Sequence, residues 1–256
     1  MSYGFAIVTV LFTCLIAGCV TALVQGHVGI DLRRHHHEVG SVVFLQLGVV
    51  FAVLLAFVFS EDWVEYNDSA QAINLEVGDL HGAAMIATTL PSAQARAVLL
   101  AEQSYLDGVV AREWPALRRT RTEDAETDRR LETLISDVAD LHLPNPDDHD
   151  KKAEILSLLA QAHGERETRI FQARNGIPVA LWCVLIAVTV MLTLFVSFSG
   201  IEYRHTSITL TVCFVGSIAS ILAIARLLDY PFEGALALSP ADFVEVLHKV
   251  TGLLRG

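Results

Sequence analysis

The sequence predicts an all-α integral membrane protein with four transmembrane helices, in two hairpins, and a helical soluble domain inserted between the hairpins. Three observations predict this class. Of its 256 residues, 53% are hydrophobic, and the apolar residues gather in four runs close to the ~20 residues that cross the hydrocarbon of a bilayer. The long segment between the second and third runs is polar. None of that segment shows the alternation typical of strands.

The first hairpin covers residues 1–60, with predicted transmembrane helices over 6–24 and 39–59. The Met-Ser-Tyr-Gly opening contains no basic residue, which argues against a secretory signal peptide. Cys19 follows a lipoprotein-like sequence, but the apolar run continues past it, so a spanning helix is favoured over a lipid anchor. All four cysteines of the chain lie inside apolar runs. They are therefore interpreted as packing residues and not as a disulfide or metal framework.

One stripe of the second span combines polar and apolar residues, and the helical pattern continues past Ser60 without a proline. At about 100° per residue, the stripe has a polar beginning, an apolar middle and a polar end. Its residues are Gln46, Val53, Phe57, Ser60, Val64, Asn67 and Gln71, with Val49 and Val50 beside it. A helix that lines a pore with a hydrophobic constriction has this pattern. A helix packed in a bundle, with its amides bonded to neighbours, has it too. The position of these residues on a helical wheel leaves both interpretations open.

Residues 61–176 are predicted to form an acidic helical domain. The net charge of the chain is −11, and nearly all of it falls in this segment, which argues against nucleic-acid binding. Basic residues near the span ends slightly favour the side that carries this domain, so the domain is predicted to be cytoplasmic.

Within this domain, prolines and capping residues mark the expected helices. A helix is expected from Ser92 to Glu113 or Trp114, and Pro115 is expected to break it or to begin the next helix. A charged helix follows, and Asp150 is predicted to cap the last helix before the membrane.

The second hairpin covers residues 177–228, with predicted spans over 177–198 and 207–228. Residues 229–256 are predicted to form an interfacial turn and then an amphipathic helix, which would pack on the domain or lie on the membrane surface.

Three groups of polar residues are candidate sites. Arg226 lies inside the fourth predicted span, where it would attract anions or extend to the interface. His35, His36 and His37 could bind zinc or sense pH, or could simply form a solvated loop. Residues 147–150 carry three aspartates that could bind calcium, although acidic residues are favoured at a helix start in any case. No catalytic motif is present, and we predict that the protein is not an enzyme.

Several segments resemble those of the bacterial bestrophin-like membrane proteins, and the resemblance covers nearly the whole chain. The segments are Glu61–Tyr66, Tyr105-Leu106, Arg112–Pro115 and Tyr230–Gly234. The resemblance implies a symmetric homopentamer with a central pore that conducts chloride or other anions. It also implies that the second span lines this pore, with a hydrophobic neck near Val53 and Phe57. The acidic run that binds calcium after the last span of bestrophins is represented here only by Asp229, Glu233 and Asp242.

The sequence therefore predicts an oligomeric, pentameric anion channel of the bacterial inner membrane, without a bound cofactor. Its expected partners are other copies of itself, the lipid bilayer and anions, but no nucleic acid. The alternative is a non-conducting scaffold or sensor whose helical domain binds another protein. A weaker alternative is a metal or proton sensor that acts through the histidines. For the channel, Val53 and Phe57 should face the symmetry axis, whereas Phe44, Phe51 and Phe59 should not.

Overall fold

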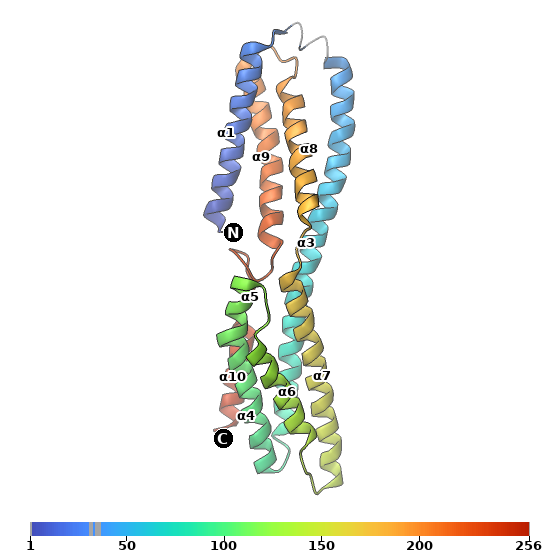
Figure 1. The fold of residues 1–256 in the computed structure, drawn as a ribbon, viewed down its shortest axis with the longest axis vertical. Helices are drawn as coiled ribbons and strands as arrows, with labels where there is room; N and C mark the ends of the chain where they lie inside the picture. The colour runs from blue at the N-terminus through green and yellow to red at the C-terminus, as the bar shows by residue number, and fades with distance from the viewer. Residues whose placement is uncertain (1, 31–32, 34–36, 256) are drawn as a thin grey trace. The chain divides into compact units, whose positions relative to one another are not determined.

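The computed structural model describes residues 2–30, 33 and 37–255, except for the side chains of 37–39. Within this part of the chain the secondary structure is helical and contains no strand, which confirms the predicted all-α class. Contacts divide the chain into two compact units (Figure 1). The span unit comprises residues 1–64 and 176–229, and the domain unit comprises residues 65–175 and 230–256.

Four helices are long and apolar enough to cross a membrane, by length and composition. They are α1 (Tyr3–His27), α3 (His37–Ala87), α8 (Val179–Ser197) and α9 (Arg204–Leu228). Each overlaps one of the four predicted spans. The helix α3 continues well past the predicted end of its span, as the proline-free sequence after Ser60 indicates.

Small residues bring α1 and α9 close together in the span unit. A Cβ atom built on Gly216 would lie 3.0 Å from the Cys14 Sγ, and one on Gly18 would lie 3.4 Å from a methyl of Val212. Close approach through glycine is a common way to pack membrane helices. The cysteine inside α1 thus has the packing role that its position suggested.

Apolar side chains from α3, α8 and α9 form the core of the span unit. Its buried members are Phe51, Leu55, Val58, Leu185, Leu192 and Ile218. The ring of Phe44 lies 5.7 Å from that of Phe214 and 6.5 Å from that of Phe195, measured between centroids. One side of α3 is therefore committed to packing inside the chain.

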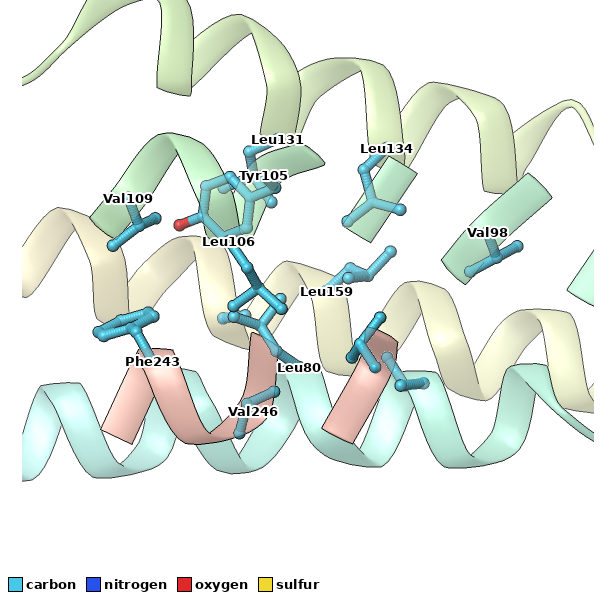
Figure 2. Packing of buried hydrophobic residues seen from close by; sticks show 14 of the residues in the cluster. Leu80, Val98, Tyr105, Leu106, Val109, Leu131, Leu134, Leu159, Phe243 and Val246 are labelled. Atoms are coloured by element: carbon cyan, nitrogen blue, oxygen red, sulfur yellow. The ribbon is translucent and has the colours of Figure 1, made fainter. Parts of the chain in front are cut away.

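The domain unit contains the domain part of α3 and six further helical segments. These are α4 (Ser92–Gly108), η1 (Val109–Glu113), α5 (Trp114–Thr120), α6 (Ala125–Ala139), α7 (Pro146–Arg174) and α10 (Ala241–Leu253). Leucines, valines and aromatic residues from α3, α4, α6, α7 and α10 meet in one core (Figure 2). The amphipathic stripe predicted for the tail supplies Phe243 and Val250 to this core, so α10 packs within the domain unit.

Of two local features predicted for the domain unit, one agrees with the structure and one differs. Pro115 occupies the first turn of α5, the second of its two predicted roles, and a π-helical turn, η1, joins α4 to α5. The helix α7 is capped by Asn145, whose side chain accepts a bond from the Asp147 backbone N–H, and not by Asp150. An asparagine cap followed by proline is a strong helix start, and it places the start of α7 ahead of Asp150.

Candidate functional site

The predicted stripe of α3 is exposed in the single chain. Phe57 is 72% exposed and Val53 is 53% exposed, although both lie in an apolar helix. The polar residues Gln46 and Ser60, before and after them, are exposed as well. The remaining stripe residues, Val49, Val50, Val64, Asn67 and Gln71, are also exposed. These stripe residues of α3 are therefore largely left open by the described part of the chain.

Phe44, Phe51 and Phe59 were predicted not to face the symmetry axis, and they lie elsewhere on α3. Phe51 is 4% exposed and belongs to the core of the span unit. Phe44 packs against that core, and Phe59 is partly buried. The position of Val53 and Phe57 at a symmetry axis stays a prediction.

Arg226 has a carboxylate beside it. Its Nη1 lies 2.9 Å from the Oδ2 of Asp229, one turn further along the chain. The other oxygen of Asp229 accepts a 2.7 Å bond from the Ile177 backbone N–H, at the entrance to α8. The side chain of Arg226 is 42% exposed.

The histidine candidates fall mostly outside the described residues. This applies to His35, His36 and the side chain of His37. Among the residues that the structure does describe, no group of three or more His, Cys, Asp or Glu side chains could hold a metal ion. In the aspartate run, Asp148 pairs with Lys151 at 2.7 Å in the first turns of α7, in keeping with a role at a helix start.

The domain unit contains a buried charge cluster that was not predicted from the sequence. The charge cluster comprises Glu76 on α3, Tyr105 on α4, Glu113 on η1 and Arg166 and Arg169 on α7. All five side chains are 0% exposed. Such burial of four ionisable groups requires that their charges be paired and hydrogen-bonded.

The cluster meets this requirement through a chain of short contacts. Arg169 donates from Nε to Glu76 at 2.8 Å and from Nη2 to Glu113 at 2.8 Å. Arg166 donates from Nη2 to the other oxygen of Glu113 at 2.6 Å. The Tyr105 hydroxyl donates to Glu76 at 2.6 Å. Two buried carboxylates thus face two buried guanidinium groups. Arg166 also donates from Nη1 to the Asp128 carboxylate at 2.6 Å, whereas the buried Nη1 of Arg169 has no partner among the described residues.

The pKa values of the cluster follow from this arrangement. Burial by itself would raise the pKa of Glu113, but Arg169 and Arg166 outweigh it, and the pKa of Glu113 lies below its usual value. Burial and the neighbouring Glu76 carboxylate raise the pKa of Tyr105 well above its usual range. These pKa shifts keep Glu113 ionised and Tyr105 neutral through the physiological pH range. The cluster is suited to fixing α3, η1 and α7 together and not to proton transfer.

Charged residues at core positions are the pattern that could have revealed this cluster. On α7 the buried residues Ile155, Leu159 and Ala162 recur every three or four positions, and Arg166 and Arg169 continue the same series. A charge on such a stripe must find a partner inside the core. The partner itself cannot be identified from spacing, because Glu76 lies 93 residues from Arg169.

Glu102 is another buried acid, and it lacks the pairing that the charge cluster has. It lies on α4 with 0% exposure, and neither carboxyl oxygen has a hydrogen-bond partner within the described part of the chain. Burial raises the pKa of Glu102 well above its usual value of 4.5. The folded domain therefore favours the protonated, neutral form of this side chain.

We expect Glu102→Gln to stabilise the domain unit at pH 8. In the unfolded chain Glu102 loses its proton near pH 4.5, whereas the folded chain keeps the proton to a higher pH. The contribution of Glu102 to the stability of the wild type is thus fully present below pH 4.5. It declines as the pH rises toward the folded-state pKa, by up to about 1.4 kcal/mol per pH unit. Glutamine cannot ionise and escapes this decline.

Thermal unfolding followed by circular dichroism between pH 4 and pH 9 measures the effect. The difference between variant and wild type should be near zero at pH 4 and should grow with pH. Glu132→Gln, at an exposed carboxyl on α6, is the matched control and should show no such growth. A constant difference at every pH would contradict the prediction.

A family model and solved structures both relate the chain to bestrophin-like proteins. The family model described as "Bestrophin-like domain" matches residues 7–243. A search of curated proteins finds no match. Among solved structures, a bacterial bestrophin homologue from Klebsiella pneumoniae superposes with a TM-score of 0.73 at 14% identity, covering 96% of this chain and 98% of that one. A point-mutated form of the homologue superposes with a TM-score of 0.73 at 14% identity, covering 97% of this chain and 100% of that one.

A third structure is described only as that of a membrane protein variant. It gives a TM-score of 0.74 at 14% identity and covers 96% of this chain and 99% of that one. At this identity the structural likeness establishes the fold, while the family model establishes the family.

Proposed function

Because the chain belongs to the bestrophin-like family, we propose that it is a bestrophin-type channel in which five copies surround a central, anion-selective pore. The proposed pore is lined by α3, with Gln46 and Ser60 on either side of a hydrophobic neck formed by Val53 and Phe57. Val49 and Val50 lie next to this stripe. Val64, Asn67 and Gln71 would continue it beyond the neck. The proposed location is the bacterial inner membrane, with the domain unit in the cytoplasm.

The observation that carries the proposal is the exposure of polar residues on a membrane-length helix. Gln46 and Ser60 are exposed in the single chain, and no water is available to such groups in the hydrocarbon of a bilayer. An aqueous pore or a polar contact with another copy would satisfy them. The opposite side of α3 is packed inside the chain through Phe51 and Leu55, so the exposed side is the one available to a pore.

The exposed Phe57 and Val53 would then form a constriction that excludes water when narrow and conducts ions when widened. Anion selectivity is proposed from the resemblance and from Arg226, whose side chain remains 42% exposed beside Asp229. Ion-substitution measurements of the reversal potential test this selectivity, and the mass of the purified assembly tests the fivefold stoichiometry.

Flux through liposomes is the central test. With purified protein we expect anion flux in wild type and about tenfold faster flux for Phe57→Ala, equivalent to about 1.4 kcal/mol removed from the barrier. The smaller side chain widens the neck and makes it easier to wet. Phe12→Ala is the matched control, because Phe12 is also an exposed phenylalanine, 60% exposed, but lies on α1.

The control should conduct like wild type. An absence of flux in both wild type and Phe57→Ala would contradict the channel. An oligomer whose axis is closed by packed side chains would instead favour the non-conducting scaffold.

A further inference from the structure

The span unit contains a cavity of about 740 Å³ that the proposed channel does not use. It lies among the C-terminal cap of α1, the first turns of α3, the end of α8 and the first turns of α9. Most of its wall is apolar, including Phe44, Leu194, Phe195 and Leu210. The volume falls in the range of about 300–1,000 Å³ typical of sites that bind small molecules.

One wall of this cavity carries a buried cation. The side chain of Arg33 lines the cavity, and Arg33 is only 6% exposed. Its Nε donates to the Val28 carbonyl at 3.3 Å, and its Nη1 donates to the carbonyls of Ser199 and Ile201 at 3.2 and 3.4 Å. These contacts hold the guanidinium in place but supply no formal negative charge.

Among the residues that the structure describes, no acidic side chain pairs with Arg33, and its hydrogen bonds come from Nε and Nη1 alone. A cation removed from water without an opposite charge is unfavourable. A guanidinium with free donors is also a good match for a phosphate or carboxylate group. The geometry therefore favours an anionic group beside Arg33.

A second polar group of the cavity wall is also without a partner. The hydroxyl of Ser199 is buried, and it has no hydrogen-bond partner in the part of the chain that the structure describes. Ser199 follows the last residue of α8, and Arg33 follows the end of α1. Both therefore lie at the end of a span, where arginine side chains reach the level of the lipid headgroups.

We propose that this cavity binds an anionic phospholipid, with one acyl chain against the apolar wall and its phosphate at Arg33 and the Ser199 hydroxyl. The bilayer is the medium that surrounds the span unit, so this occupant is present at high concentration. The apolar wall suits an acyl chain, and the buried Arg33, which no acidic side chain of the described residues neutralises, favours an anionic headgroup over a zwitterionic one.

Lipid binding to the purified full-length protein tests the charge at Arg33. Native mass spectrometry in a neutral detergent gives dissociation constants for phosphatidylglycerol and for phosphatidylcholine with the same acyl chains. We expect wild type to prefer phosphatidylglycerol by about tenfold or more, which corresponds to at least about 1.4 kcal/mol. Arg33→Gln should lose this preference. Arg204→Gln, at an exposed arginine that begins α9, should keep it.

A second variant tests the cavity itself. Gly40 lines the cavity, and a Cβ atom there would meet no atom within 4 Å. Gly40→Phe should therefore fill the cavity and reduce the number of bound lipids. Gly48→Phe is the control on the same helix, because a Cβ atom there also meets no atom and Gly48 does not line the cavity.

Four outcomes would overturn the proposal. Equal affinity for the two lipids would show that the cavity does not select an anionic headgroup. Equal lipid preference in Arg33→Gln and Arg204→Gln would show that Arg33 does not bind the headgroup. Full competition by inorganic phosphate would identify a small free anion as the ligand. Dissociation of the oligomer by Gly40→Phe, with an unchanged lipid count, would show that a second copy of the chain fills the cavity.

Discussion

Replacing Arg169 with alanine is expected to lower the free energy of unfolding of the domain unit by about 3–5 kcal/mol, the usual effect of removing one partner from a buried ion pair. The side chain bonds to both Glu76 and Glu113 and is fully buried. Its loss leaves Glu76 without a positive neighbour, and Arg166 becomes the remaining partner of Glu113 in the cluster. The packing of Arg169 against Trp114 and Phe243, with ring centroids 5.5 and 5.2 Å from its Cζ, is lost as well.

The matched control is Arg129→Ala, which removes an arginine whose side chain is 69% exposed beside Glu126 on α6. Exposed pairs of this kind contribute little, and the control should stay within about 0.5 kcal/mol of wild type. Thermal unfolding and amide hydrogen exchange of α3 and α7 measure both variants. Similar stability of the two variants would show that the charge cluster does not hold the domain together.

Replacing Trp114 with alanine is the second large effect, at about 3–5 kcal/mol. Trp114 is 2% exposed, and its ring lies 5.3 Å from that of Phe232 and 5.6 Å from that of Phe243. It thus joins α5 to the segment after the fourth span and to α10, and alanine leaves a cavity at that junction.

Trp114→Phe distinguishes the contribution of ring packing to stability from the contribution of the indole N–H. The buried Nε1 has no hydrogen-bond partner among the described residues, so phenylalanine removes an unsatisfied donor while it keeps an aromatic ring. We expect this variant to lose less than half as much stability as the alanine variant in the same melting experiment. Equal losses would show that ring contact with Phe232 and Phe243 contributes little.

Hydropathy and helix capping were enough to predict the four spans, because both depend on neighbours in the chain. The run from Ser41 to Ser60 has no proline and is apolar enough to span, and α3 forms there. The same local rules placed the start of α4 to within one residue: Ser92, the predicted cap, is the first helical residue, and Pro91 holds the N-cap position without a side-chain bond. For α7 the predicted cap, Asp150, was wrong, because Asn145 caps the helix earlier in the chain; asparagine and aspartate are both good capping residues.

The interior of the domain unit could not be predicted in this way. Its abundant acidic and basic residues indicated a solvated surface, yet Glu113, Arg166 and Arg169 lie in the core. The π-helical turn before Trp114 was also missed. Such a turn changes the register of the helix after it, and both Glu113 and Trp114 are buried there. That register depends on side chains of α7 and α10, which lie far away in sequence.

The candidate pore could be predicted only in part. Periodicity identified the stripe on α3, and the packing of Phe44 and Phe51 inside the span unit explains which side of α3 stays exposed. What covers the stripe depends on other copies of the chain. A single sequence therefore identifies the residues of the stripe more readily than their surroundings.

The charge cluster also has a consequence for the order in which the protein is made. Glu76 is synthesised 93 residues before Arg169, a delay of roughly 5–20 s at ordinary translation rates of about 5–20 residues per second. During that interval the Glu76 carboxylate has no arginine of the cluster to neutralise it, so it remains hydrated and the α3 segment around it cannot enter a dry core. The domain unit can close only after α7 has left the ribosome, when its last arginine completes the pairing.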